Sequence, residues 1–306
     1  MKKLKLYDSK PEKRKEDLEP WKPEKYIPVG FENFAVTDGF IAQEKILKEL
    51  DLFVEDIFDG TYHNFLFQAY SGYGKTVLAE RMIRYLDADG EHSQLYIPTD
   101  GLIPFDKKKT IHFIDEAHQL KDVEQFYPLM LSGKYIFILA TNEFDKLKEP
   151  LVNRCIPFVF EPYTLDDITK IIRPVFEKRG LGKLSDDWLY EFAGYGRNNP
   201  RISKTNALRI ALLLNKDSDT ITAENVFGVI KEYLNIERGG FNHYDRNYIE
   251  CLEKCGGTAS LALLESLMQV PKNIITKEVE PFLIGRGLLR ISRTGRTLLR
   301  FEENPT

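Results

Sequence analysis

A glycine-containing turn constrains the fold of this chain more than any other feature. The turn Ala69-Tyr70-Ser71-Gly72-Tyr73-Gly74-Lys75-Thr76 follows the apolar run 65–67 and precedes a segment with helical periodicity over residues 76–86. Glycines let a backbone approach a ligand closely, and the first amides of a helix favour an anion. The order of strand, turn and helix therefore predicts a phosphate-binding loop in a parallel α/β sheet.

The side chains of this turn match the needs of a bound nucleotide. We expect the backbone of Gly72, Tyr73 and Gly74 to surround the phosphates of ATP, Lys75 to neutralise the β- and γ-phosphates, and Thr76 to bind Mg²⁺. The alternative is an ordinary glycine-rich turn. Ala69 replaces the first glycine that is usual in such loops, which costs about 1 kcal/mol if that position needs a left-handed φ.

Two acids follow the apolar run 111–114, where a parallel strand would end at a ligand crevice. Asp115 would hold the Mg²⁺ shell, and Glu116 would orient and deprotonate the attacking water. A surface helix cap at Asp115 is the alternative, but it leaves the glycine turn unexplained. The letters Asp115-Glu116-Ala117-His118 also match a class of helicase that needs a second alternating strand–helix domain, and no such pattern follows Pro162.

Apolar runs divide the chain into four regions. Further strands are expected over 95–97, 111–114, 135–139 and 158–160, alternating with helices, and helices alone follow Pro162. Thr164 and Asp167 have the spacing of a capping box at the start of the first of these helices. Beyond Gly239-Gly240, which marks a break, helices near 244–254, 259–268 and 274–283 precede strands near 288–292 and 297–301. We therefore expect a charged arm (1–28), an α/β core (29–161), a helical lid (162–238) and a winged helix (239–306).

Three polar residues stand where an ATPase would read the γ-phosphate. Asn142 follows an apolar run and would hold the lytic water, Arg154 would reach a neighbour's γ-phosphate as an arginine finger, and Arg201 opens a lid helix as a sensor. Each arginine alone is more often a solvated surface charge. Their order and spacing are typical of AAA+ ring ATPases. A finger that acts on a neighbour needs head-to-tail contacts, which close into rings, so we expect a homo-oligomer, with a hexameric ring as the expected form.

The chain resembles the RuvB family, the motors of bacterial Holliday-junction branch migration. The resemblance rests on the glycine turn, on the acidic strand end, on Arg154, on Asn199-Pro200-Arg201-Ile202, and on C-terminal residues that include Asp245-Arg246, Glu280-Pro281-Phe282-Leu283-Ile284 and Gly295-Arg296. It spans about 29–303 and implies an AAA+ core, a lid and a winged helix in a hexamer that pumps duplex DNA. It also implies that Tyr163 packs near the adenine, although Tyr163 could equally be an interdomain core residue.

Two departures from the family concern protein partners. The family carries a long β-hairpin after the acidic pair, which docks a junction-recognising protein. Here only residues 117–134 separate the acids from the next strand, enough for a helix and a turn. Asn153-Arg154-Cys155 is also closer to the Ser-Arg-Cys of clamp loaders. The sequence therefore leaves open whether a family-type protein partner binds this segment, and a possible protein partner is unknown.

The C-terminal hairpin is the expected contact for duplex or branched DNA. The whole chain has a net charge of −4, but the charged residues from 285 to 300 are all arginines. Arg286, Arg290, Arg293 and Arg296 are the expected DNA contacts, with Arg290 and Arg296 straddling a backbone. A solvated basic hairpin, or one that docks on an acidic protein, is the alternative.

Composition excludes some settings. No apolar run approaches the ~20 residues of a membrane helix. The basic N-terminus lacks the apolar stretch of a signal peptide, and three cysteines without metal spacing fit reduced cytosolic thiols, so we expect a cytoplasmic protein. The expected activity is an ATP-driven DNA translocase. A clamp or helicase loader and a winged-helix docking switch remain alternatives.

Overall fold

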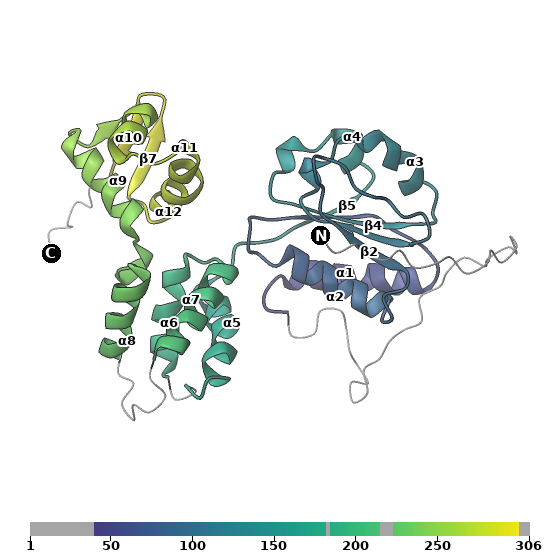
Figure 1. Ribbon diagram of the computed structural model, residues 1–306, viewed down its shortest axis with the longest axis horizontal. Helices are drawn as coiled ribbons and strands as arrows, with labels where there is room; N and C mark the ends of the chain where they lie inside the picture. Colours follow the sequence, from purple (N-terminus) through teal and green to yellow (C-terminus); the bar gives the residue numbers. More distant parts are fainter. Residues whose placement is uncertain (1–39, 182–183, 215–222, 300–306) are drawn as a thin grey trace, which may run out of the picture. The chain divides into compact units, whose positions relative to one another are not determined.

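A computed structural model describes residues 40–181, 184–214 and 223–299. The chain divides into two compact units, a core unit (Met1–Glu161) and a C-terminal unit (Pro162–Thr306) (Figure 1). The expected charged arm over 1–28 lies outside the described residues. Within the described ranges no helix is both long and apolar enough to span a bilayer. All three cysteines are free thiols.

The core unit is built on a five-stranded parallel sheet. Its strands are β1 (Phe65–Gln68), β2 (Ser93–Tyr96), β3 (Ile111–Ile114), β4 (Ile136–Thr141) and β5 (Ile156–Val159), in the order β2-β3-β4-β1-β5. The expected parallel sheet is therefore confirmed. The chain leaves β1 toward β2 on one side, and the connection from β4 to β5 passes over β1. This reversal of direction makes the carboxyl end of β1 the position where α/β sheets bind ligands.

Helices cover both faces of the sheet, as the continuous apolar runs of the strands require. Helices α1 (Glu44–Phe58) and α2 (Lys75–Leu86) lie on one face, and α3 (Tyr127–Met130) and α4 (Glu149–Val152) lie on the other (Figure 1). Alternate residues of each strand point to opposite faces. In β1, Phe65 and Phe67 belong to the cluster under α1 and α2, whereas Leu66 belongs to the opposite cluster.

The connection from β2 to β3 contains no helix, contrary to the expected alternation. Phe105, in this connection, takes the place of a covering helix on the sheet. Its ring stacks on His112 at 4.2 Å and on Phe137 at 6.0 Å between centroids. The hydroxyl of Tyr96 accepts a hydrogen bond from the Asp106 amide (3.2 Å) and fixes the connection beside the sheet. Aromatic stacking thus replaces helix packing at this edge.

The segment between β3 and β4 is short, as its length predicted. It holds two 3-10 turns, Ala117–Gln119 and Val123–Phe126, followed by the single turn of α3. Val123, Phe126 and Met130 are buried against the sheet. No β-hairpin is present in this segment, all of which is described.

The first part of the C-terminal unit is the helical lid. It contains α5 (Leu165–Glu177), α6 (Asp186–Ala193), α7 (Pro200–Leu213) and α8 (Ala223–Val229). The expected capping box is confirmed, because the Thr164 side chain accepts from the Asp167 amide while Asp167 accepts from the Thr164 amide. The Ser185 side chain caps α6 by accepting a hydrogen bond from the Trp188 amide (3.3 Å). Phe176, Trp188 and Phe192 pack together in the lid core.

The second part is a winged helix. Its elements are α9 (His243–Lys254), β6 (Thr258–Ala259), α10 (Leu261–Met268), α11 (Lys272–Ile274), α12 (Glu280–Gly285), β7 (Leu289–Ser292) and β8 (Gly295–Leu298). A π-helical segment over Ile275–Val279 joins α11 to α12. The sheet order is β6-β8-β7, all antiparallel. Strand β8 begins earlier than expected, and residues 300 and 301 of the expected strand lie outside the described residues.

Candidate functional site

The glycine turn lies at the carboxyl end of β1, between the strand and helix α2. Gly72 and Gly74 adopt left-handed φ values of 87° and 92°, which other residues tolerate poorly. Ala69 does not adopt a left-handed φ, and its amide donates to the carbonyl of Thr141 on β4 (3.3 Å). The strain considered for alanine at this position is therefore absent. The turn has the backbone that a phosphate-binding loop needs.

Lys75 and Thr76 begin α2 and point into this turn. The Lys75 ammonium is buried and donates to the carbonyls of Ala69 (2.8 Å) and Tyr70 (3.3 Å). The Thr76 hydroxyl donates to Oδ2 of Asp115 at 2.8 Å. A hydroxyl and a carboxylate in contact are oxygen donors of the kind that Mg²⁺ prefers, so these two residues could hold that ion beside a phosphate. The residues therefore fit ATP and Mg²⁺.

Glu116 follows Asp115 and leaves the sheet in an unusual conformation. Its φ is 51°, and left-handed non-glycine residues concentrate at functional sites. Its buried Oε2 makes no hydrogen bond within the described part of the chain and lies 3.4 Å from Nδ1 of His118. The carboxylate that would act on water is thus adjacent to a histidine.

His118 connects this acid to the end of β4. Its Nδ1 also lies 3.1 Å from the Thr141 hydroxyl, and its Nε2 lies 3.7 Å from Glu143. Thr141 is fully buried, whereas Asn142, the expected holder of the lytic water, is exposed. Because β3 and β4 are neighbouring parallel strands, both ends lie at one edge of the sheet. Asn142 is therefore on the same sheet edge as the acids.

Arg154 lies at the opposite end of the strands, where β1 and β5 begin. It precedes β5, whose first residue Ile156 is opposite Phe65 at the start of β1. The guanidinium rests over the ring of Tyr127 at 4.5 Å and donates to the carbonyl of Pro150 at 2.5 Å. Strand β1 has 4 residues, a length of about 13 Å. Arg154 is thus separated from the glycine turn of its own chain by the length of the sheet.

Two expected site residues belong to the C-terminal unit. Tyr163 is 3% exposed and lies just before α5. Arg201 is exposed in the first turn of α7, where its amide donates to the side chain of Asn199 at 3.1 Å. Asn199 caps the helix and Pro200 occupies its first position.

The four expected DNA arginines differ in their surroundings. Arg290 on β7 and Arg293 at the hairpin turn are exposed. Arg286 is exposed too, but it donates to the carbonyl of Gly239 at 2.7 Å and lies over the ring of Phe282. Only Arg290 and Arg293 therefore project from the wing without a described internal contact.

Arg296 has different surroundings from the other three arginines. Its Nε donates to the buried Glu280 at 2.8 Å, and the same carboxylate oxygen accepts from the Tyr248 hydroxyl at 3.1 Å. Hydrogen bonding to Glu280 raises the pKa of Arg296. Arg296 pairs with Ile291, whereas Arg290 pairs with Thr297, so Arg290 and Arg296 lie on opposite faces of the hairpin. The inward face and the ion pair take Arg296 out of a shared DNA-facing surface.

Comparisons with known proteins agree with this architecture. Residues 238–300 match the family model of the RuvB C-terminal winged helix domain. The Thermotoga maritima RuvB Holliday junction branch migration motor has a similar structure, with a TM-score of 0.71 and 24% identity over 86% of this chain and 94% of that one. The C-terminal domain is therefore similar to the RuvB winged helix domain, and the fold of the chain is similar to that of the Thermotoga motor. A point variant of the same Thermotoga protein matches this chain over 87% of its length and 95% of the variant's, again with a TM-score of 0.71 and 24% identity.

The sequence patterns gave no role to three residues that the structure places beside these sites. His118, beside Glu116, belongs to the sequence Asp115-Glu116-Ala117-His118, which matches a class of helicase. The sequence therefore did mark this histidine, although that match was set aside. Tyr127, under Arg154, belongs to the pair Tyr127-Pro128, which resembles the family, but it was given no role of its own. Arg197 stands two residues before the motif Asn199-Pro200-Arg201-Ile202, and nothing in the sequence marked it.

Proposed function

We propose that this protein is an ATP-driven translocase on double-stranded DNA, of the branch-migration type. ATP and Mg²⁺ would bind at the glycine turn through Lys75, Thr76 and Asp115. When bound, Mg²⁺ neutralises charge on the phosphates. Glu116 would hold the attacking water and accept its proton, and Asn142 would fix the position of that water. Arg201 and Tyr163 would contact the nucleotide from the lid.

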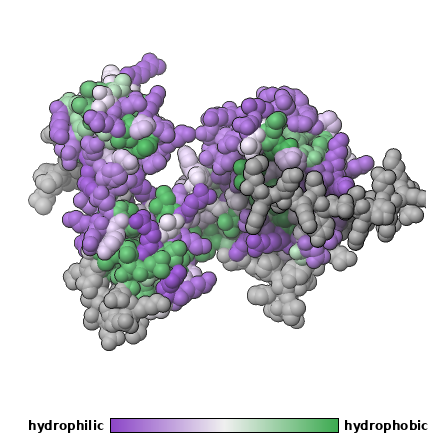
Figure 2. Space-filling model, in the orientation of Figure 1, coloured by the Kyte–Doolittle hydropathy of each residue, from purple (hydrophilic) through white to green (hydrophobic). Residues whose placement is uncertain are grey.

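The observation that carries the proposal is the position of Arg154 at the sheet edge away from the glycine turn. An arginine side chain cannot cover about 13 Å of strand, so Arg154 would act on the ATP of a neighbouring chain. Stabilising the transition-state charge in this manner requires a head-to-tail assembly, and we propose a hexameric ring. Exposed apolar residues on α7, among them Ile202 and Leu212, support a lid interface between chains, and apolar residues gather on the visible face of the lid (Figure 2).

The winged helix would supply the DNA contact. Arg290 and Arg293 are exposed on the hairpin and would bind phosphates without reading sequence, as movement along DNA requires. The similarity of residues 238–300 to the RuvB winged helix domain supports duplex or branched DNA as the partner.

The first experiment measures steady-state ATP hydrolysis without DNA, with linear duplex and with a four-way junction. We expect stimulation by DNA, loss of all hydrolysis in Glu116→Gln, and loss of stimulation when Arg290 and Arg293 are both alanine. The matched control replaces Lys178 and Lys204, two exposed lysines of the lid, and should keep the stimulation. Loss of the two phosphate contacts should reduce the salt slope of DNA binding by about 2. A hydrolysis rate that neither linear duplex nor a four-way junction changes would contradict the proposal.

A mixing experiment tests the neighbour's finger separately. An Arg154→Ala chain keeps its own site but offers no finger, whereas a Glu116→Gln chain offers a finger but has no base. Each alone should be nearly inactive, and their mixture should regain hydrolysis if the arginine acts between chains. A mixture as inactive as its components would place the function of Arg154 within its own chain.

A loader that places a clamp or helicase on DNA is the second candidate. The short segment Ala117–Lys134, without a hairpin, and the order Asn153-Arg154-Cys155 favour it. A translocase moves a junction with no added replication protein, whereas a loader does not. Junction movement by the purified chain alone therefore separates these two functions.

A further inference from the structure

Arg197 of the lid makes several contacts with the winged helix. It follows the short turn Gly194–Gly196 of the lid, and its side chain is 16% exposed. The guanidinium pairs with Asp245 on α9, donates to the carbonyls of Gly240 (3.3 Å) and Glu278 (3.1 Å), and lies over the ring of Phe282 at 4.1 Å. Arginine can make such a set of directed contacts because its five donors are held in a rigid plane.

Asp245 lies in the first turn of α9, in the winged helix. It is fully buried, and the oxygen that pairs with Arg197 also accepts from the Asn242 amide at 2.7 Å in the capping box of that helix. Its other oxygen, Oδ1, has no hydrogen-bond partner among the described residues. Burial raises the pKa of Asp245 against the attraction of Arg197. A buried carboxylate in this position depends on its arginine, because an unpaired buried charge is costly.

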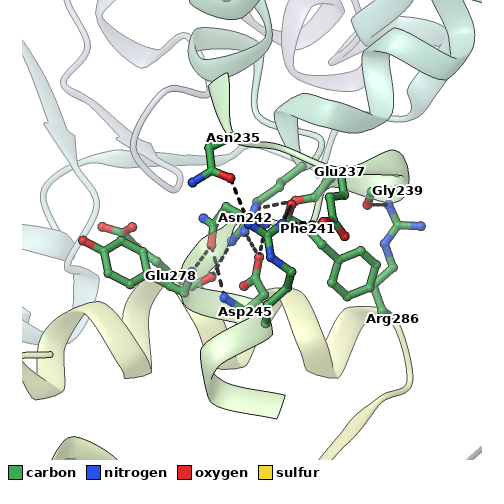
Figure 3. A network of polar contacts seen from close by, with 12 residues as sticks. Asn235, Glu237, Gly239, Phe241, Asn242, Asp245, Glu278 and Arg286 are labelled. Atoms are coloured by element: carbon green, nitrogen blue, oxygen red, sulfur yellow. Dashed lines mark hydrogen bonds and ion pairs between the residues drawn. The ribbon is translucent and has the colours of Figure 1, made fainter. Parts of the chain in front are cut away.

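The linker between the lid and the winged helix, residues 235–240, is packed on both sides (Figure 3). Arg246 of α9 donates to Asn235 at 2.9 Å and lies 3.3 Å from Glu237. Arg286 donates to Gly239. A Cβ added at Gly240 would lie 2.7 Å from the carbonyl oxygen of Gly194. The linker therefore lies against the lid and leaves no slack between the domains.

The same turn also begins the proposed sensor helix. Arg197 and Asn198 adopt left-handed φ values of 55° and 56°, a conformation that costs energy in non-glycine residues. The next residue, Asn199, caps α7, and Arg201 lies in its first turn. Displacement of the start of α7 therefore acts directly on the guanidinium that binds the winged helix.

We propose that Arg197 is a positioning residue that joins the sensor end of α7 to the winged helix, so that nucleotide-driven motion of the lid moves the DNA-binding wing. The second half of this inference rests on the proposed function. Arg197 touches neither nucleotide nor DNA in this scheme. It acts by keeping two domains in one orientation, which a flexible linker would not do.

The experiment compares wild type with Arg197→Ala and Arg197→Lys. Both variants should keep the basal hydrolysis rate and the DNA affinity, because the glycine turn and the wing remain. The stimulation of hydrolysis by duplex DNA should fall at least about fivefold, the lower range of allosteric coupling. The matched control Arg238→Ala removes an exposed arginine of the same linker, whose ion pair with Glu191 lies at the surface, and should leave the stimulation intact. Unchanged stimulation in both Arg197 variants overturns the inference.

A second readout needs no DNA. Spin labels carried by non-canonical residues at Lys204 on α7 and Glu253 on α9, both exposed, report the distance between the domains. We expect one narrow distance distribution in wild type and a broad one in Arg197→Ala. Asp245→Asn retains an acceptor for the helix cap but not the charge, and should also broaden it. If DNA does not stimulate hydrolysis by wild type but the distances broaden in the variants, the translocase is contradicted and the positioning role of Arg197 is retained. Distances that stay unchanged in every variant overturn that role.

Discussion

His112 makes the stability of the core unit depend on pH. It lies on β3, inside the sheet and fully buried, and its ring stacks on those of Phe105 and Phe137 at 4.2 and 5.2 Å between centroids. Its Nε2 donates to the carbonyl of Lys109 at 2.9 Å, so Nδ1 is left to accept from the Tyr96 hydroxyl at 3.1 Å. Both nitrogens are satisfied in the neutral ring, and a second proton would place a charge in this buried aromatic cluster.

The magnitude follows from the pKa. Burial lowers the pKa of His112 from 6.5 to about 4. Between these values the unfolded chain binds more protons than the folded chain, so the free energy of unfolding falls as the pH falls. The contribution is complete above the unfolded value and is lost as the pH falls toward the folded value. Acidification from about pH 7.5 to about pH 5 should therefore destabilise the core unit by about 2 kcal/mol, at ~1.36 kcal/mol for each pKa unit.

The assay is urea denaturation followed by far-ultraviolet circular dichroism at the two pH values. His112→Phe is the matched variant, because it keeps an aromatic ring between its neighbours and cannot titrate. In a Trp21→Phe background the fluorescence of Trp188 reports the C-terminal unit alone, which should show no effect of the His112 variant. We expect wild type to lose about 2 kcal/mol more than the variant on acidification.

The difference in stability loss between wild type and His112→Phe isolates the contribution of His112, because every other ionisable group is present in both proteins. An equal loss of stability in wild type and His112→Phe would mean that His112 is protonated in the folded core. The reasoning from burial and from the two hydrogen bonds would then be refuted.

Three further substitutions test other contacts. Tyr127→Ala removes the ring beneath the proposed arginine finger and should lower hydrolysis in the assembled protein, while Tyr127→Phe should not; rates over a range of protein concentration measure this. Glu280→Ala leaves Arg296 unpaired in the winged helix and should destabilise the domain by about 3 kcal/mol in thermal denaturation; an effect near zero contradicts the buried pair. Gly196→Ala places a Cβ 2.8 Å from the backbone of Ser203 and should lower the urea midpoint of Trp188 fluorescence, and an unchanged midpoint would show that the lid accommodates it.

Local patterns predicted those features that depend on neighbours in the sequence. The capping box of Thr164 and Asp167 is one, because a helix start is decided within one turn. The contact between Thr76 and Asp115 is another, since parallel strands bring their carboxyl ends to one edge whatever lies between them. The roles assigned to these site residues stay predictions.

Features set by distant packing were not predictable. No sequence pattern in residues 97–110 predicts that Phe105 stacks on the sheet in place of a helix. The alternation of arginines in the wing suggested that Arg290 and Arg296 straddle a DNA backbone, but the hairpin register places them on opposite faces. That register depends on Gly295, whose added Cβ would lie 2.7 Å from the carbonyl oxygen of Ala259, a partner outside the hairpin.

The glycine pair at 239–240 shows how one sequence signal has two opposite physical meanings. Paired glycines between domains indicate a flexible break when the backbone is free, and this interpretation placed a boundary there. In the structure Gly240 has a φ of 86° and lies against Gly194, so a glycine is needed because a side chain would not fit. Gly240→Ala should therefore loosen the lid from the winged helix and broaden the distance between labels at Lys204 and Glu253. A flexible break would instead tolerate alanine or be stiffened by it, so a narrower distribution would restore the first interpretation.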